Sequence, residues 1–471
     1  MKIILADAHG PVRGKAQMSP NLGLLYLASY LRERIEGLEL RYVPQNWELR
    51  EHIRLIEEMR PDLYAMSFTS YGARVAYASI AELKARFPDL PIVCGGPHPS
   101  SAPEDLLTRT AADLCVIGEG EETFTEIVRQ GSGLMDNLAS VRGIAYRAPD
   151  GSYRENAPRE LIADLDSVPF PARDLVNEDD FTGSALRRGV PDTEMIITRG
   201  CPLRCVFCAN PVFRVDGPLY RARSPESIAA EVEELYRMGY RELYLHSDEL
   251  NVRLGWSIEV CKALAALGHD DLYFQANLRV VPMDEELARW LKRANFWMVR
   301  FGIESASERV LRGIKKRMAP GRTERTLRLM AEHNIKVFGF FMMFQIWQDK
   351  EGNLEFETVE EVNRSLRTIR DYWRKNLLHY MAWGEAVPVQ GAEMYDVAVR
   401  HGIIDRSYYP DEPWRVHDRL PHVSKAEYAR IVRHGRLLQG AMALRNGSIN
   451  WSNWTGLMVK AKDLLVGAQT K

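Results

Sequence analysis

The sequence has few cysteines, no excess of one charge and no long apolar run. Six cysteines in 471 residues are too few for a disulfide framework and indicate a reducing compartment. With 62 basic and 64 acidic residues, the chain lacks the large field that would attract nucleic acid or an anionic membrane. No apolar run reaches the ~18–20 residues that a membrane-spanning helix needs, and the apolar start is too short for a signal peptide. We therefore expect a cytoplasmic protein with neither nucleic-acid nor membrane partners.

The length and the order of patterns predict an α/β protein of more than one domain. At 471 residues, 46% of them hydrophobic, the chain exceeds one ordinary core. We expect a doubly wound parallel sheet over residues 1–140, a Pro- and Asp-rich linker over 141–190, a partial (β/α)6 barrel of the TIM type over 191–390, and a C-terminal capping segment over 391–471.

In the first domain, short β-rich runs alternate with helical patterns. The strands are expected at 2–7, 63–68, 91–94 and 114–117, and helices at 23–33 and 75–86. Ligands of such sheets bind outside the carboxyl ends of the strands, where glycine-rich turns follow at 95–99 and 118–123. The first domain is therefore predicted to offer a binding crevice.

A second alternation of strands and helices begins after residue 190. Six strands are expected at 194–198, 242–247, 272–276, 298–303, 336–343 and 379–384, with helices such as 224–238 and 323–333 between them. Six βα units form a partial barrel whose active site lies at the carboxyl ends of its strands.

Three clustered cysteines, Cys201, Cys205 and Cys208, follow the first of these strands. Their C-x3-C-x2-C spacing can supply three thiolates to a [4Fe-4S] cluster, and no nearby fourth cysteine exists to close it. One iron would then remain open to a small ligand. The alternatives are a structural zinc site, which normally uses four ligands with paired knuckles, or buried free thiols.

This motif, with the aromatic Phe207 before its last cysteine, resembles the radical S-adenosylmethionine (radical SAM) family. Later strand ends are similar to that family in order, at 246–251, 275–279 and 301–311. The resemblance implies that SAM binds the open iron, and it assigns SAM contacts to Asp248, Glu249, Asn277, Arg279, Gly302, Glu304 and Ser305. Asp248 and Glu249 would hold the SAM amino group and Arg279 its carboxylate. The alternatives are that the acidic pair caps the next helix and that Arg279 makes a surface ion pair.

The first domain resembles the cobalamin-binding domain of one large radical SAM class. The matching turns are Ser19–Leu25, Ser67–Thr69, Gly95–Pro99 and Gly118–Glu121. The resemblance implies a corrin crevice formed by Ser67, Thr69, Gly95, Gly96, His98, Gly118 and Glu119, in which His98 shapes the crevice. The D-x-H-x-x-G motif is incomplete, since Val12 replaces its second glycine, and we interpret His9 as a loop residue. The alternative is a vestigial domain that holds no cobalamin.

The fifth strand of the barrel departs from the family. Members commonly read F-x-x-G-x-P-G-E-T, whereas this chain continues with Phe341-Met342-Met343-Phe344-Gln345. Polar and aromatic side chains are expected at the barrel mouth, and they suit a small polar substrate. They are Gln345, Trp347, Gln348, Asp349, Trp383, Glu385 and Gln390. The alternative is that these residues pack against the C-terminal segment.

The resemblance implies reductive cleavage of SAM to a 5′-deoxyadenosyl radical that takes hydrogen from a polar small molecule, such as a sugar or aminoglycoside intermediate. An electron donor such as flavodoxin or ferredoxin is implied. Methyl transfer from methylcobalamin is the favoured continuation. The alternative is cobalamin-independent dehydration, as in the dehydratase of apramycin biosynthesis acting on paromamine, with Glu385 or Asp349 as catalytic groups. A non-catalytic cobalamin-binding sensor is the third hypothesis.

Overall fold

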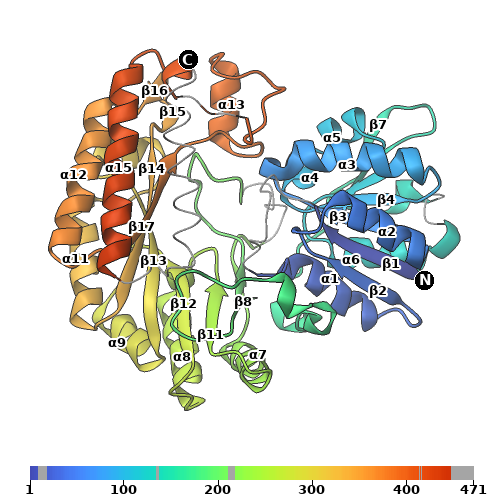
Figure 1. Ribbon diagram of the computed structural model, residues 1–471, viewed down its shortest axis with the longest axis horizontal. Coiled ribbons are helices and arrows are strands. Elements are labelled where there is room, and N and C mark those ends of the chain that lie inside the picture. The colour runs from blue at the N-terminus through green and yellow to red at the C-terminus, as the bar shows by residue number, and fades with distance from the viewer. Residues whose placement is uncertain (9–18, 134–136, 211–217, 413, 415, 447–471) are drawn as a thin grey trace.

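Two α/β units lie side by side in this computed structural model (Figure 1), which describes residues 1–8, 19–133, 137–210, 218–412, 414 and 416–446. The first unit is a seven-stranded sheet in the order β2-β1-β3-β4-β5-β6-β7. Its strands are β1 (Lys2–Asp7), β2 (Glu39–Val43), β3 (Leu63–Ser67), β4 (Ile92–Gly95), β5 (Leu114–Val116), β6 (Ile144–Arg147) and β7 (Tyr153–Glu155).

Helices cover both faces of this sheet. They are α1 (Leu22–Arg32), α2 (Leu49–Met59), α3 (Ala73–Arg86), α4 (Pro97–Ser101), α5 (Pro103–Arg109) and α6 (Glu121–Arg129). Because side chains alternate along a strand, Ile3 and Leu5 pack into the core beneath α1 and α6, while Ile4 packs into the core on the other side, with α2 and α3. β1 is apolar on both faces for this reason.

The first sheet is mixed rather than wholly parallel, and it extends further than expected. β1 to β5 are parallel, whereas β6 pairs with β5 and β7 with β6 in antiparallel fashion. Both added strands lie within residues 141–190, which we expected to be a linker. They are short and only partly apolar, and so their sequences carry little strand signal. β2, which was not predicted, pairs with β1 at one edge.

The second unit is a partial barrel of six parallel strands in the order β17-β14-β13-β12-β11-β8. Its strands are β8 (Asp192–Ile196), β11 (Glu242–His246), β12 (Tyr273–Leu278), β13 (Phe296–Glu304), β14 (Lys336–Met343) and β17 (Tyr380–Glu385). The outer helices are α7 (Pro225–Arg237), α8 (Leu254–Ala266), α9 (Glu285–Arg293), α10 (Glu308–Gly313), α11 (Pro320–Glu332) and α12 (Val359–Arg374). The expected (β/α)6 architecture is confirmed.

Helix starts in the barrel follow from local chemistry. Ser224 accepts a hydrogen bond from the Ser227 N–H at the start of α7, whose first residue is a proline. Thr358 and Glu361 form a reciprocal capping box at the start of α12. These caps direct each chain segment away from the carboxyl end of the preceding strand and leave those strand ends to face the first unit.

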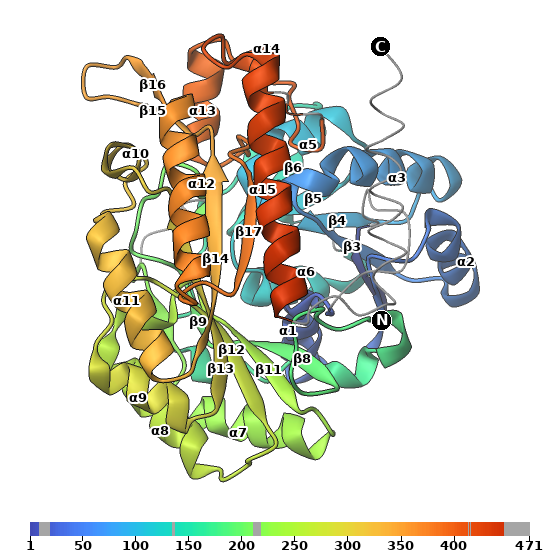
Figure 2. The ribbon, with the colours of Figure 1, turned by 60° about the vertical axis from the view of Figure 1, so that its left-hand side comes forward.

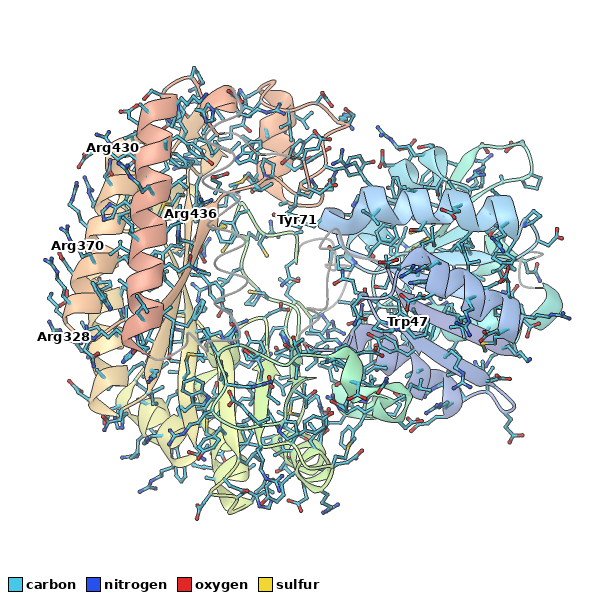
Figure 3. All side chains as sticks on the ribbon, viewed as in Figure 1. Trp47, Tyr71, Arg328, Arg370, Arg430 and Arg436 are labelled. Carbon is cyan, nitrogen blue, oxygen red and sulfur yellow. The ribbon has the colours of Figure 1, made fainter. Side chains whose placement is uncertain are left out.

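The C-terminal segment forms α13 (Glu393–Arg400), α14 (Val416–Arg419) and α15 (Lys425–Arg445). Figure 2 shows α15 lying along the outside of the barrel beside α12, so this helix extends the outer layer rather than covering the barrel mouth. Figure 3 labels Arg328, Arg370, Arg430 and Arg436 on this outer layer of α11, α12 and α15. The aromatic cluster of Trp451 and Trp454 lies outside the described residues. Within the described part of the chain, no helix is long and apolar enough to cross a membrane.

Candidate active site

A cavity of about 680 Å³ lies between the two units. On one side it is lined by the carboxyl ends of β3, β4 and β5 with the turns that follow them, and on the other by the ends of β8, β11 and β12. Carboxyl ends of parallel strands are the usual ligand sites of both kinds of sheet, and here the two sets of ends face each other. The cavity therefore extends from the predicted corrin crevice to Asp248 and Asn277 of the predicted SAM site. Of the cysteine-bearing segment, Gly200 and Asn210 line it, whereas Cys201, Cys205 and Cys208 do not.

The loop that carries the three cysteines is framed by a short antiparallel ladder. β9 (Thr198–Arg199) pairs with β10 (Arg221–Ala222), and Arg199 stands opposite Arg221. Gly200 has a φ of +83°, and a Cβ there would lie 2.5 Å from the carbonyl oxygen of Leu219. Only glycine permits this approach. We call residues 200–220 the cluster loop, of which the structure describes 200–210 and 218–220.

The middle of the cluster loop is anchored to the barrel. Val206 is buried, and its N–H donates to the carbonyl oxygen of Ile314 while its own carbonyl accepts from the Met394 N–H. Cys201, Cys205 and Cys208 are half-buried and form no disulfide. Burial raises the pKa of the Cys201 thiol to about 11.

These three thiols fit a cluster better than a single ion. Among the described residues, no group of three or more His, Cys, Asp or Glu side chains is arranged to hold one metal ion. A [4Fe-4S] cluster takes each thiolate at a different iron, and so its cysteines stand further apart than the ligands of one zinc ion. Burial raises the pKa of Cys205, although the nearby Lys316 opposes that rise.

Arg279 presents an unsatisfied buried group near the cluster loop. Its Nε donates to the carbonyl oxygen of Val281 at 3.0 Å and its Nη2 to that of Lys316 at 3.2 Å. Its Nη1 is buried without a hydrogen-bond partner among the described residues. A buried guanidinium nitrogen of this kind fits a carboxylate ligand, as expected for SAM, and the arginine makes no surface ion pair.

Asp248 and Glu249 follow β11 near the same loop. Asp248 is exposed and lines the cavity, and its N–H donates to the Thr198 hydroxyl. Glu249 precedes the 3-10 helix Leu250–Val252 without a side-chain capping bond, so helix capping does not explain it. Burial raises the pKa of Glu249 to about 7, although Lys316 and Arg279 oppose that rise.

Gly302 leaves room for a buried ion pair. A Cβ at Gly302 would lie 2.6 Å from both the Glu304 carboxylate and the Lys316 ammonium. Lys316 Nζ lies 3.0 Å from Glu304 Oε1, and both side chains are buried. Burial lowers the pKa of Lys316, but the carboxylates of Glu304 and Glu249 outweigh burial and raise it. Lys316 carries no sequence signal, because it belongs to an ordinary basic run.

Ser305 lies away from the cavity, contrary to the expected SAM contact. Its hydroxyl is buried, donates to Glu357 at 2.8 Å and lies 3.3 Å from the Ser365 hydroxyl. The side chain therefore joins β13 to α12. The Gly-Ile-Glu-Ser pattern does not distinguish a ligand contact from such a link.

The wall from the first unit contains most of the residues expected there. Ser67, Thr69, Gly95, Gly96 and Gly118 line the cavity. Gly96 has a φ of +92°, and a Cβ on it would lie 2.5 Å from the Ser67 Oγ, so this turn requires glycine.

His98 is buried behind this wall rather than in it. Its Nε2 lies 2.9 Å from the Tyr77 hydroxyl and its Nδ1 lies 3.1 Å from the Ser70 hydroxyl. Burial lowers its pKa to about 4, which keeps the ring neutral. His98 thus supports the turn from below. His9 lies outside the described residues.

Glu119 lines the cavity but is bound by the two arginines that flank the cluster loop. Arg221 donates to both carboxylate oxygens, at 2.8 and 2.9 Å, and Arg199 lies 3.3 Å from one of them. We expected Glu119 to contact a cofactor, but we did not predict its contacts with the two arginines. No sequence motif predicts these contacts, because the arginines lie 80 or more positions after Glu119.

The barrel wall adds a row of polar side chains, of which only Asn277 was expected at a cofactor site. His246 Nε2 lies 2.6 Å from Glu194 Oε2, and the Tyr244 hydroxyl donates to Asn277 Oδ1 at 2.6 Å. Glu194, His246 and Asn277 line the cavity. Their alternation along β8, β11 and β12 was a possible signal, because inward side chains of neighbouring strands share one surface.

The expected substrate residues after β14 and β17 are mostly structural. Trp347 is buried against Gly313, and Trp383 packs against Gly435 of α15. Asp349 closes the hairpin between β15 (Ile346–Gln348) and β16 (Leu354–Phe356) by accepting from the Asn353 N–H at 2.7 Å. It does not line the cavity. Gln345, Gln348 and Gln390 donate to backbone carbonyl oxygens.

Glu385 differs from these residues because burial raises the pKa of its carboxyl group. It ends β17 and accepts a hydrogen bond from the Tyr428 hydroxyl of α15. It does not line the 680 Å³ cavity.

Comparison with known families agrees with this geometry. Residues 195–357 match the model of the Radical SAM superfamily, and residues 15–128 match that of the B12 binding domain. The chain thus combines a region similar to the radical SAM superfamily with a region similar to B12-binding domains. It is a radical SAM enzyme with an N-terminal B12-binding domain, and a [4Fe-4S] cluster, SAM and, by implication of the first domain, cobalamin are its cofactors.

Relatives resemble the chain over both units. An uncharacterised methyltransferase of Pyrococcus horikoshii is 27% identical over 420 residues, which cover 88% of this chain and 86% of the relative. The cytidylyl-2-hydroxyethylphosphonate methyltransferase of Streptomyces wedmorensis is 26% identical over 383 residues, covering 75% and 69%.

Solved structures share the fold. The tryptophan-bound radical SAM methyltransferase TsrM of Kitasatospora setae has a TM-score of 0.61 at 19% identity, with 81% of this chain and 72% of that chain covered. The cobalamin-dependent radical SAM enzyme OxsB has a TM-score of 0.65 at 21% identity, covering 85% and 55%.

Proposed function

We propose that the protein is a cobalamin-dependent radical SAM methyltransferase that acts on a small polar molecule. The observation that carries this proposal is the single cavity lined by the turns of the B12-binding domain on one side and by the strand ends beside the cluster loop on the other. A methyl donor and a hydrogen-abstracting cofactor must both reach one carbon, and a shared cavity meets that requirement.

Residues in and beside this cavity suit defined roles. We assign Cys201, Cys205 and Cys208 to the cluster, and the unpartnered Nη1 of Arg279 to the SAM carboxylate. Asp248 and Glu249 supply negative charge for the SAM ammonium, since a charge-assisted pair is the strong form of hydrogen bond. The ring centre of Phe207 lies 6.0 Å from the Lys316 ammonium, and the ring shields the same region from water.

The cofactors supply the radical and the methyl group, and the chain supplies orientation. The Glu194 carboxylate, whose pKa His246 lowers against burial, holds the imidazole ring at the cavity wall. Tyr244 fixes the Asn277 amide in the same wall. These groups present hydrogen-bonding atoms to a substrate with hydroxyl or amino groups.

The relatives support methyl transfer. Two that span most of the chain are named methyltransferases, although their substrates differ or are unassigned. The match to an enzyme superfamily also supports catalysis over the sensor hypothesis.

Cobalamin-independent dehydration of a sugar or aminoglycoside such as paromamine is the second candidate. Two observations favour it. Among the described residues of the first unit, no histidine lines the cavity to ligate cobalt, since His52 and His98 are buried elsewhere. In addition, Glu385 is a carboxyl group with a raised pKa, which suits proton donation to departing hydroxide.

Anaerobic reconstitution tests the proposal. Wild-type protein should take up four irons, form 5′-deoxyadenosine with dithionite and show cobalamin absorption after incubation with hydroxocobalamin. The triple variant Cys201→Ala, Cys205→Ala, Cys208→Ala should lose the cluster and 5′-deoxyadenosine. A double change of Cys94→Ala and Cys261→Ala, at buried cysteines outside the motif, is the control. Turnover of SAM without cobalamin uptake would overturn the methyltransferase proposal in favour of dehydration.

A further inference from the structure

Two glutamates of the first unit form ion pairs with the arginines at the two ends of the cluster loop. The loop leaves the barrel at Arg199 and returns at Arg221, and these residues face each other in the β9–β10 ladder. The turn Gly118–Glu121 of the B12-binding domain lies against this ladder, because Glu119 contacts both arginines and Glu121 accepts from Arg199 Nη2 at 2.5 Å. We call these four side chains the interdomain clamp.

At Arg221 the clamp is a bidentate pair with Glu119, whereas Arg199 pairs with both Glu119 and Glu121. Arg221 Nη1 and Nη2 donate to the two oxygens of Glu119, a fork geometry that fixes direction as well as distance. Arg221 Nη1 also donates to the Ile162 carbonyl oxygen at 2.7 Å, and the Ile162 N–H donates to Glu119 at 3.0 Å. Ile162, in the segment that connects the two domains, therefore belongs to the same hydrogen-bond network.

The four charges balance within a largely buried site. The Arg221, Glu119 and Glu121 side chains are 5%, 12% and 6% exposed, so solvent screens these pairs little. Arginines hold the pKa of Glu119 below its ordinary value although burial opposes them. The Tyr26 ring, 5.6 Å from the Arg199 guanidinium, completes the packing. Removing one member leaves an uncompensated buried charge.

The position of the clamp relates it to both cofactor sites. Gly118 and Glu119 line the wall of the cavity that the B12-binding domain provides. Arg199 is separated from Cys201 only by Gly200, which lies too close to the Leu219 carbonyl oxygen to carry a Cβ. A displacement of the turn therefore acts on the chain two residues before the first cysteine.

We propose that Glu119 is a positioning residue that holds the cluster loop in register with the B12-binding domain, so that the two cofactor sites keep one fixed separation. The inference rests on the proposed function for the assignment of the cysteines to the cluster. It does not require Glu119 to touch a cofactor, and it applies to dehydration as well as to methylation, because both need the loop held.

The test combines thiol labelling of the apoprotein with turnover of the holoenzyme. In apoprotein, Glu119→Gln and Arg221→Gln should each raise the rate of Cys201 and Cys205 alkylation by iodoacetamide by about tenfold, as loop opening becomes easier. The double variant should resemble the worse single variant, because both changes break one contact. In reconstituted holoenzyme, Glu119→Gln should lower the ratio of product to 5′-deoxyadenosine by a similar factor.

Asp411→Asn is the matched control. It removes an ion pair with Arg74, N···O 2.8 Å, that also joins the first unit to a distant segment but lies far along the chain from the loop. It should change neither the labelling rate nor the product ratio. Thermal melting of each variant verifies folding.

Three outcomes would overturn the proposal. They are labelling rates unchanged in both variants, additive effects in the double variant, and loss of cobalamin uptake by Glu119→Gln with labelling unchanged, which would make Glu119 a cofactor contact. Absence of 5′-deoxyadenosine from the wild-type holoenzyme would instead count against the proposed function, since labelling of the apoprotein is independent of it.

Discussion

At the scale of single residues, the site combines buried charges that satisfy one another with a few that are left for a ligand. Lys316 and Glu304 form a closed pair, whereas Arg279 retains a buried nitrogen without a partner. Asp248 and Glu249 add negative charge on the side of β11. Arg279 and this acidic pair therefore match the two ends of an amino acid, a carboxylate and an ammonium.

The acidic pair is expected to bind the SAM ammonium. The double variant Asp248→Asn, Glu249→Gln should weaken SAM binding by tenfold or more, because a lost charge-assisted hydrogen bond costs roughly 1.5–3 kcal/mol. Isothermal titration of reconstituted protein measures the dissociation constant, and iron content should stay the same. Glu259→Gln, at an exposed glutamate of α8 paired with Lys262, is the control. An unchanged SAM affinity would remove the pair from the site.

Glu357 makes stability depend on pH. It is fully buried, and burial raises its pKa from 4.5 to about 8, although the Ser305 hydroxyl opposes that rise. A raised folded-state pKa contributes stability that is complete below pH 4.5 and is lost as pH rises to 8, by about 1.4 kcal/mol per pH unit. Melting curves at pH 6 and pH 9 should show Glu357→Gln losing less stability than wild type.

Glu360→Gln serves as the control for this measurement, because Glu360 is exposed in the first turn of α12, three residues after Glu357, and pairs with Arg367. It should follow the wild-type pH profile. Parallel profiles for Glu357→Gln and wild type would show that Glu357 does not titrate in this range.

At the scale of elements, the cluster loop is shaped by its ends rather than by its cysteines. The β9–β10 ladder, the glycine at its start and the backbone bonds of Val206 bring the thiols to the barrel mouth. β13 contributes similarly, since its irregular pairing with β14 after Gly302 places Glu304 at a φ of +63° beside Lys316. The backbone conformation at the strand ends therefore positions the cysteine thiols and Glu304.

Gly200→Ala should disturb the loop. The new Cβ would meet the Leu219 carbonyl oxygen in a positive-φ conformation, with a strain of about 1–3 kcal/mol. We expect fewer irons per chain after reconstitution and faster cysteine alkylation. Gly255→Ala, in α8 where a Cβ meets nothing within 4 Å, should reconstitute like wild type. Equal iron content in the two variants would contradict a strict requirement for glycine at position 200.

At the scale of the whole molecule, two sheets present their carboxyl ends to one cavity. The C-terminal segment contributes to this arrangement, because the Tyr409 hydroxyl donates to Asp105 of the first unit while α15 packs along the barrel. Figure 3 labels Trp47 and Tyr71 on the first unit, and Tyr71 is 47% exposed. The relative placement of the units therefore depends on contacts at both ends of the chain.

A bulky side chain at the cavity rim should exclude cobalamin. Thr69 is exposed and lines the cavity, so Thr69→Trp should reduce cobalamin uptake while sparing the cluster. A change at Gly96 is a poorer choice, because a Cβ there would collide with Ser67 whatever the ligand. Uptake is measured by absorption after gel filtration. Glu82→Trp, on the exposed face of α3, controls for added bulk, and equal uptake by both variants would place the corrin elsewhere.

The sequence by itself determined the two α/β units, the six barrel strands and the cysteine motif, because strand periodicity and short spacing are local properties. The resemblance to the radical SAM family also indicated Arg279 and Asp248, and the position of the glycine turns after strands indicated a ligand crevice. Only the tertiary structure separated Ser305 and Asp349 from the cavity, buried His98 behind it, and joined Glu119 to Arg199 and Arg221. Those outcomes depend on contacts between residues tens of positions apart, and neither composition nor spacing records which polar groups meet when two sheets pack against each other.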